Sequence, residues 1–189
     1  MNTPAHLIVG AAAFARPGDR RVTGLALLGA LLPDLSLYVL AGAALFLFGM
    51  PPGHVFGTLY FSTTWQTVFA IDNSFVIWGA LFAVGLWKKS AGLMALAGAA
   101  LLHLLLDFPL HHDDGRPHFW PLTNWVYESP ISYWDSQHHA RWVAPIEAAL
   151  VTVLAVGMLR RFSTWPMRIL VVVLLAAEIW VVRQWLWFF

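Results

Sequence analysis

Histidine and aspartate residues recur inside otherwise apolar stretches of this chain. His103 and Asp107 are four residues apart, so both side chains project from one face of a helix. Asp34 and Asp72 interrupt two other apolar stretches, and His6 lies in a third near the start. Ionisable groups in lipid are costly and usually face a protein interior or a wet cavity. The pattern therefore predicts a polar centre inside the membrane.

The spacing of His103 and Asp107 is a chelating geometry for a divalent metal. The chain has no cysteine, so thiolate metal sites, disulfides and cysteine nucleophiles are excluded. Imidazole and carboxylate ligands favour Zn²⁺, Mn²⁺ or Fe²⁺, and zinc is the preferred prediction. His111 and His112 follow directly at the expected mouth of the cavity and are also predicted ligands. The same connection adds weaker candidates, namely His118, Asp135, His138 and His139.

The composition is that of a polytopic membrane protein. Of 189 residues, 59% are hydrophobic and only 11% are charged, whereas soluble domains carry about a quarter charged residues. We expect one integral membrane domain over residues 1–189, because the chain is too short for a large additional soluble domain. The net charge of +1 makes nucleic acid an unexpected partner. Membrane lipid, and other membrane-protein subunits, are the expected partners.

The apolar segments predict an all-α fold. A short membrane-inserted helix should run from Thr3 to about Ala15, because Pro4 suits the first turn of a helix. About five transmembrane helices should follow, and Pro33 should kink the first of them beside Asp34. Their expected ranges are 22–49, 65–87, 92–107 or 108, 143–159 and 165–187. The connection at 110–141 is rich in proline and tryptophan and should form an ordered cap.

Basic residues predict the orientation of these spans. Cytoplasmic loops of membrane proteins carry an excess of lysine and arginine. One side would carry Arg16, Arg20, Arg21, Lys88, Lys89, Arg160, Arg161 and Arg168, and the other only Arg116, Arg141 and Arg183. We therefore expect a multi-pass protein of the cell inner membrane. Its N-terminal basic loop should be cytoplasmic, and the 110–141 cap should lie on the outer face.

Distance from the cytoplasmic flank places several polar residues at a similar depth. At ~1.5 Å per helical residue they lie roughly 15–27 Å above the inner edge. This set contains His6, Asp34, Asp72, His103, Asp107 and Glu147. Simpler interpretations remain for single members. His6 alone could be a packing residue, the 111–114 run could be a solvated loop, and Glu178 could contact a partner subunit.

Several short motifs resemble the YdjM-like membrane-bound metal-dependent hydrolases. They are Thr3-Pro4-Ala5-His6, Leu28-Gly29-Ala30-Leu31-Leu32-Pro33-Asp34, His103-Leu104-Leu105-Leu106-Asp107 and Phe119-Trp120-Pro121-Leu122. The resemblance covers roughly residues 3–125, and the order of the motifs is more specific than any one of them. That family is thought to be related to zinc-dependent phospholipases C and nucleases of the P1 type. The resemblance implies that His6, Asp34, His103 and Asp107 are metal ligands.

The chain departs from that family in its second span. Family members commonly carry a His-Arg pair and then Thr-His-Ser, where this chain has Asp72-Asn73-Ser74. Either Asp72 replaces the missing ligand or His54 reaches in from its loop. Otherwise the site holds fewer metals, or the fold is kept without hydrolase activity.

Two functions follow from the sequence. The first is an integral membrane hydrolase that attacks a lipid-like or phosphoester substrate with metal-activated water, with Asp72 or Asp107 as the base. No sequence motif supports serine catalysis. The second is a non-catalytic accessory subunit of a larger membrane complex. Stoichiometric metal would favour the hydrolase.

Overall fold

The computed structural model describes residues 1–188, and within them the fold is helical with no strands, as predicted. Phe189, the last residue of the predicted domain, lies outside the described residues. The elements in chain order are α1 (Thr3–Phe14), α2 (Arg20–Gly42), the π-helical turn η1 (Ala43–Leu47), α3 (Pro52–His54), the π-helical turn η2 (Val55–Leu59), α4 (Thr63–Asp72), α5 (Phe75–Trp87), α6 (Ala91–Asp107), the 3₁₀ turn η3 (Ser136–His138), α7 (Ala140–Arg161) and α8 (Trp165–Phe188).

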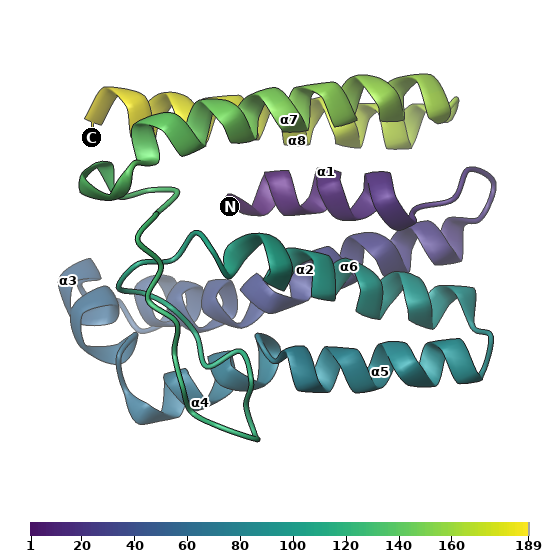
Figure 1. Cartoon of the computed structure of the whole chain (residues 1–189). Coiled ribbons are helices and arrows are strands. Elements are labelled where there is room, and N and C mark those ends of the chain that lie inside the picture. Colours follow the sequence, from purple (N-terminus) through teal and green to yellow (C-terminus); the bar gives the residue numbers. More distant parts are fainter. Residues whose placement is uncertain (189) are drawn as a thin grey trace.

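Helix α1 lies inside the bundle. Figure 1 shows it between the α7–α8 pair on one side and α2 and α6 on the other, and it packs against all four. Residues such as Ala5, Ile8 and Ala11 are almost fully buried. A helix that is apolar all round suits such a central position. Its sequence start is as predicted, with Pro4 in the first turn.

The predicted count of about five transmembrane helices is not confirmed. In the described part of the chain, four segments are long and apolar enough to cross a membrane: Arg20–Leu47, Thr63–Trp87, Ala140–Arg161 and Trp165–Gln184. Helices α1 and α6 are apolar but shorter. Each is packed among other helices and carries site residues at or near one end.

The second predicted span is not one continuous helix. Helix α4 ends at Asp72, and α5 starts at Phe75 after a break at Asn73 and Ser74. The Ser74 hydroxyl accepts a hydrogen bond from the backbone N–H of Ile77 and so caps α5. The Asn73 side-chain amide donates to the Pro33 carbonyl at 3.2 Å. The break thereby ties this segment to α2, which continues as one helix through Pro33.

The connection between α6 and α7 folds back over the bundle. The backbone N–H of Phe75 donates to the His118 carbonyl at 2.8 Å, so the connection supplies an acceptor to the start of α5. Within it, the Ser129 N–H donates to the His111 carbonyl at 3.0 Å. The rings of Phe108 and Tyr127 stack with centroids 4.9 Å apart. These contacts give the segment a defined path without regular secondary structure.

The turns that carry basic residues meet at one end of the bundle. Figure 1 shows the α1–α2, α5–α6 and α7–α8 connections at the same end, opposite the α6–α7 connection. Arg161 of the α7–α8 end donates to the Ala15 carbonyl at 2.5 Å, which joins two of these turns. The clustering agrees with the predicted alternation of basic loops.

Gly29 marks a close approach of α2 to α6, and its substitution should disrupt this contact. A Cβ atom at Gly29 would lie 1.9 Å from the Leu96 carbonyl oxygen, which belongs to backbone and cannot move aside. We expect Gly29→Ala to lower the free energy of unfolding by about 1–3 kcal/mol. Gly24→Ala is the matched control in the same helix, because a Cβ there meets nothing within 4 Å. Reversible denaturation in detergent would measure both, and equal stability of the two variants would contradict the packing.

Candidate metal centre

Three buried side chains converge where the end of α6 meets the start of α1. His6 Nε2 lies 2.8 Å from Asp107 Oδ1, and His103 Nε2 lies 3.2 Å from Asp107 Oδ2. One possible ligand atom from each residue lies within 4.8 Å of the other two. His6 and His103 are 1% exposed and Asp107 is 6% exposed. Two imidazoles and one carboxylate are a donor set that suits zinc.

Helix geometry explains why these residues meet. His103 and Asp107 share a face of α6 because they are one turn apart, and α1 packs against that face. The rings of His6 and His103 stack with centroids 3.5 Å apart and planes 6° apart. The convergence predicted from depth alone is therefore a direct contact between α1 and α6.

The hydrogen bond on the far side of His103 orients its ring. His103 Nδ1 lies 2.7 Å from the Ala30 carbonyl oxygen, which can only accept, so Nδ1 carries the hydrogen. In the neutral ring, Nε2 then presents its lone pair to the cluster. This nitrogen is buried and has no hydrogen-bond partner among the described residues, despite the nearby Asp107 carboxylate. A backbone acceptor that fixes the tautomer is the usual support of a metal-ligating histidine, so the residues fit a bound ion.

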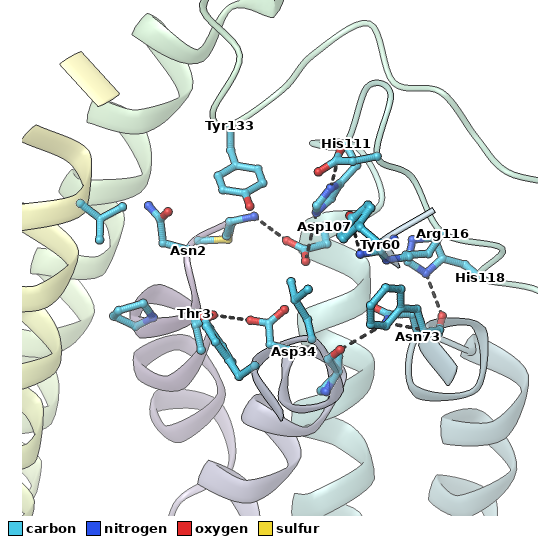
Figure 2. A pocket seen from close by; sticks show the side chains of 18 residues that line it. Asn2, Thr3, Asp34, Tyr60, Asn73, Asp107, His111, Arg116, His118 and Tyr133 are labelled. Atoms are coloured by element: carbon cyan, nitrogen blue, oxygen red, sulfur yellow. Dashed lines mark hydrogen bonds and ion pairs between the residues drawn. The ribbon is translucent and has the colours of Figure 1, made fainter. Parts of the chain in front are cut away.

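Asp34 adds a second carboxylate beside the cluster. Its Oδ1 lies 3.6 Å from His103 Nε2, and its Oδ2 accepts a hydrogen bond from the Thr3 hydroxyl. The Thr3 hydroxyl also lies 2.7 Å from the Tyr38 hydroxyl. The Asp34 side chain is 24% exposed, which makes it more open to the cavity than Asp107. Figure 2 shows the Thr3–Asp34 contact below Asp107.

Residues before α1 anchor that helix to α7 and α8. The backbone N–H of Asn2 donates to Glu147 Oε1 at 2.7 Å, and its side-chain amide donates to Glu178 Oε1 at 3.2 Å. The Met1 amine lies 2.5 Å from Asp107 Oδ1. Glu178, for which the sequence suggested a contact with a partner subunit, thus joins Glu147 around Asn2. These contacts set the position of His6 one turn further along.

A cavity of about 280 Å³ opens beside the cluster. Asp34 and Asp107 lie on its wall together with Asn73. The α6–α7 connection contributes a second wall, and Figure 2 shows His111 and Tyr133 of this connection directed toward Asp107. That wall consists of His111, Asp114, Arg116, His118 and Tyr133. The predicted cap therefore supplies polar groups as well as cover.

His111 bridges two carboxylates at the edge of the cluster. Its Nε2 lies 3.4 Å from Asp107 Oδ2, and its Nδ1 lies 2.8 Å from Asp114 Oδ1. Burial on its own would lower the pKa of His111, but Asp107 and Asp114 outweigh burial and raise that pKa to about 9. Without a metal, His111 is thus a cation at neutral pH, and it neutralises part of the local negative charge.

Two predicted site residues lie away from the cavity. Asp72 does not line it; its backbone carbonyl accepts from the Trp78 indole at 2.7 Å, and the neighbouring Asn73 faces the cavity instead. Consecutive residues at a helix end point in different directions, so Asn73 and not Asp72 lies on the cavity wall. His112 is also misplaced: its Nδ1 lies 2.7 Å from the Ser129 carbonyl oxygen, and its ring stacks on His138 at 3.5 Å.

Other polar residues of the connection form a separate contact. His138 Nδ1 lies 2.6 Å from Asp135 Oδ2, beside the ring of His112. Neither His138 nor Asp135 lines the cavity, and His54, the other suggested replacement ligand, does not line it either. Asn73 occupies the cavity position where the resemblance expects a histidine.

Tyr60, Arg116 and Tyr133 line the cavity but were not singled out as site residues from the sequence. Tyr60 precedes α4, and Arg116 and Tyr133 lie in the α6–α7 connection, so no helical periodicity relates them to the cluster. In the sequence, Arg116 contributed only to the asymmetry of basic residues between the two sides of the membrane. A basic residue among His and Asp residues in one connection was the available signal for Arg116.

Comparison with known proteins adds no relative: no protein-family profile, curated protein or solved structure matches this chain. The candidate centre therefore depends on its own geometry.

His118 should make stability depend on acid pH. Burial lowers the pKa of His118 to about 4, even though the Asn73 carbonyl accepts a hydrogen bond from its Nδ1 at 2.8 Å. An unfolded histidine takes up a proton near pH ~6.5. The unfolded state thus binds more protons between pH 6.5 and 4, and stability present above pH 6.5 should be lost as pH falls through this window.

The measurement is the thermal midpoint in detergent from pH 7.5 to 4. His118→Gln should show a shallower decline than wild type, whereas His54→Gln, which removes an exposed imidazole, should keep the wild-type profile. Parallel profiles for wild type and His118→Gln would contradict a buried neutral His118.

Proposed function

We propose that this protein is an integral membrane metal-dependent hydrolase. The observation that carries the proposal is the buried cluster of His6, His103 and Asp107, in which His103 Nε2 has no hydrogen-bond partner among the described residues and faces a carboxylate. Buried polar atoms without partners are rare in stable proteins and call for an explanation. A divalent ion, with zinc as the preferred identity, would satisfy this nitrogen.

The residues divide into ligands and helpers. His6, His103 and Asp107 would hold the ion, and Asp34 is near enough to join them or to bind water. When bound, such an ion lowers the pKa of water and polarises a phosphoryl or acyl oxygen. Asp34 takes the role first predicted for Asp72, because it lies on the cavity wall and retains exposure. Its contact with the Thr3 hydroxyl fixes one oxygen and leaves the other toward His103.

Tyr133 supplies a neutral donor on the opposite wall. Burial raises the pKa of its phenol well above the usual value, and the negative charges of Asp107 and Asp114 act in the same direction. The phenol therefore keeps its proton throughout the physiological range. A protonated hydroxyl in the cavity can donate to a substrate oxygen, which is the kind of fixed dipole that stabilises developing negative charge.

The environment favours a substrate that reaches the site from the membrane surface. The cavity lies at the α6–α7 end of the bundle, away from the basic turns, and the excess of basic residues at those turns favours a cytoplasmic location for them. The cavity would then open on the outer face of the inner membrane. A lipid-like or phosphoester substrate, hydrolysed by water, suits a polar cavity within an apolar bundle.

Metal content is the direct test of the centre. Purified wild-type protein should retain about one equivalent of zinc, and His103→Gln should lose most of it, because removing one ligand of a small site weakens affinity strongly. Plasma mass spectrometry after dialysis gives the stoichiometry. His112→Gln is the matched control, since that imidazole contacts Ser129 and His138 outside the cavity. Equal zinc in both variants would place the metal elsewhere.

Hydrolytic activity should distinguish Asp107 from Asp72, the two aspartates that the sequence predicts to be catalytic. Asp107→Asn should lower hydrolysis of phosphoesters and lipid esters by about a hundredfold or more, because one side chain both binds the ion and contacts two histidines. Asp72→Asn should stay within about threefold of wild type, since Asp72 does not line the cavity. If wild type loaded with zinc hydrolyses nothing and copurifies with a membrane complex, the accessory-subunit interpretation replaces this one.

A further inference from the structure

Arg116 is a buried cation without a carboxylate beside it. The residue is 9% exposed and lines the cavity. No carboxylate oxygen of the described residues lies within 4.0 Å of its guanidinium, and its hydrogen bond there is Nη2 to the Tyr60 hydroxyl at 2.7 Å. Buried charges are normally paired. Asp114 lines the same cavity and acts on Arg116 only at longer range, so the guanidinium keeps room for an anion in direct contact.

Aromatic side chains fix the guanidinium in place. Its central carbon lies 4.4 Å from the centroid of the Phe69 ring and 4.9 Å from that of Tyr60. Both rings are almost fully buried, so the cation cannot turn out to solvent without losing these contacts. One of the five N–H donors of a guanidinium is used by Tyr60. The preorganised fork suits the tetrahedral oxygens of a phosphoryl group.

The guanidinium shares one cavity with the candidate metal ligands. Arg116 and Tyr60 line the same cavity as Asp34 and Asp107 (Figure 2). The volume of about 280 Å³ is near the lower limit for small-molecule pockets, roughly 300 Å³. It accommodates a headgroup and not a complete lipid. A phosphoryl group there could face the cation on one side and the histidine cluster on the other.

We propose that Arg116, positioned by Tyr60 and Phe69, forms the binding subsite for a phosphoryl oxyanion. The shared chemistry is that of a phosphate group, carried by a lipid headgroup or free in water. This inference deepens the proposed hydrolase by naming the group that its substrate presents. It rests on the proposed function only for the reaction, because anion binding by Arg116 requires no metal.

Inorganic phosphate is the probe, titrated calorimetrically against the full-length protein in neutral-lipid nanodiscs at constant ionic strength. Titrations use chelator-treated and zinc-loaded protein. Arg116→Gln should weaken phosphate binding by about tenfold or more, because a charge-assisted hydrogen bond is lost. This should hold for the chelator-treated protein, the zinc-loaded protein or both, wherever wild type binds phosphate. The zinc content of Arg116→Gln should be unchanged. Arg141→Gln is the matched control: it removes an exposed arginine beside Trp142 and should bind phosphate as wild type does.

Two further variants keep the test decisive. Arg116→Lys retains the charge if the glutamine variant does not fold, and it should still weaken binding severalfold because the planar fork is lost. His103→Gln should lose zinc but keep the Arg116-dependent part of phosphate binding, so failure of the metal centre and failure of the subsite are distinguishable. Absence of phosphate binding in both states of wild type, or equal binding by wild type and both Arg116 variants, would overturn the proposal.

Nanodisc composition identifies the source of the phosphate. If the subsite takes a lipid headgroup, phosphatidic acid in the disc should compete with inorganic phosphate in wild type and raise its apparent dissociation constant. If the subsite takes free phosphate, phosphatidic acid and phosphatidylcholine discs should give equal constants. Either result supports the subsite if it depends on Arg116. In Arg116→Gln, the competition by phosphatidic acid should disappear in the first case, and phosphate binding in both kinds of disc should be lost in the second.

Discussion

The need to satisfy Asp107 inside an apolar helix bundle organises much of this structure. A charged side chain buried among apolar side chains is costly unless it is paired. Asp107 ends α6 and is met by His6 from α1, by His103 from its own helix and by His111 from the connection that follows. Three separate segments must keep their relative positions for these contacts to exist. The close helix contacts at small residues serve that alignment.

Sequence patterns predicted the helices well and the irregular segments poorly. The apolar runs indicated every long helix, because burial and lipid exposure both demand apolar side chains. The break at Asn73 and Ser74 was missed, since its stability comes from the Pro33 carbonyl and from a serine cap, and hydropathy does not report either. The outcome at α6 is similar: its sequence fits a span, but its helix of 17 residues is shorter than the four candidate spans of the described residues.

The same division applies to the candidate centre. His103 and Asp107 were predicted as a pair because helical periodicity alone determines that they share a face. Asp72 and His112 do not line the cavity, because each lies where the chain leaves regular structure and a rotation by one residue redirects the side chain. Arg116 and Tyr60 come from segments whose path no periodic pattern describes, so the aromatic contact that holds the guanidinium was visible only in three dimensions.

The central place of α1 has a consequence for the order of assembly. Helix α1 precedes the other described helices in the chain, yet the groups that hold its start, Glu147 and Glu178, belong to α7 and α8. His6 therefore has only part of its surroundings while α2 to α6 are being inserted. The α7–α8 hairpin can pack over α1 only after both of its helices have been synthesised. Until then, the start of α1 lacks the two carboxylates that hold Asn2.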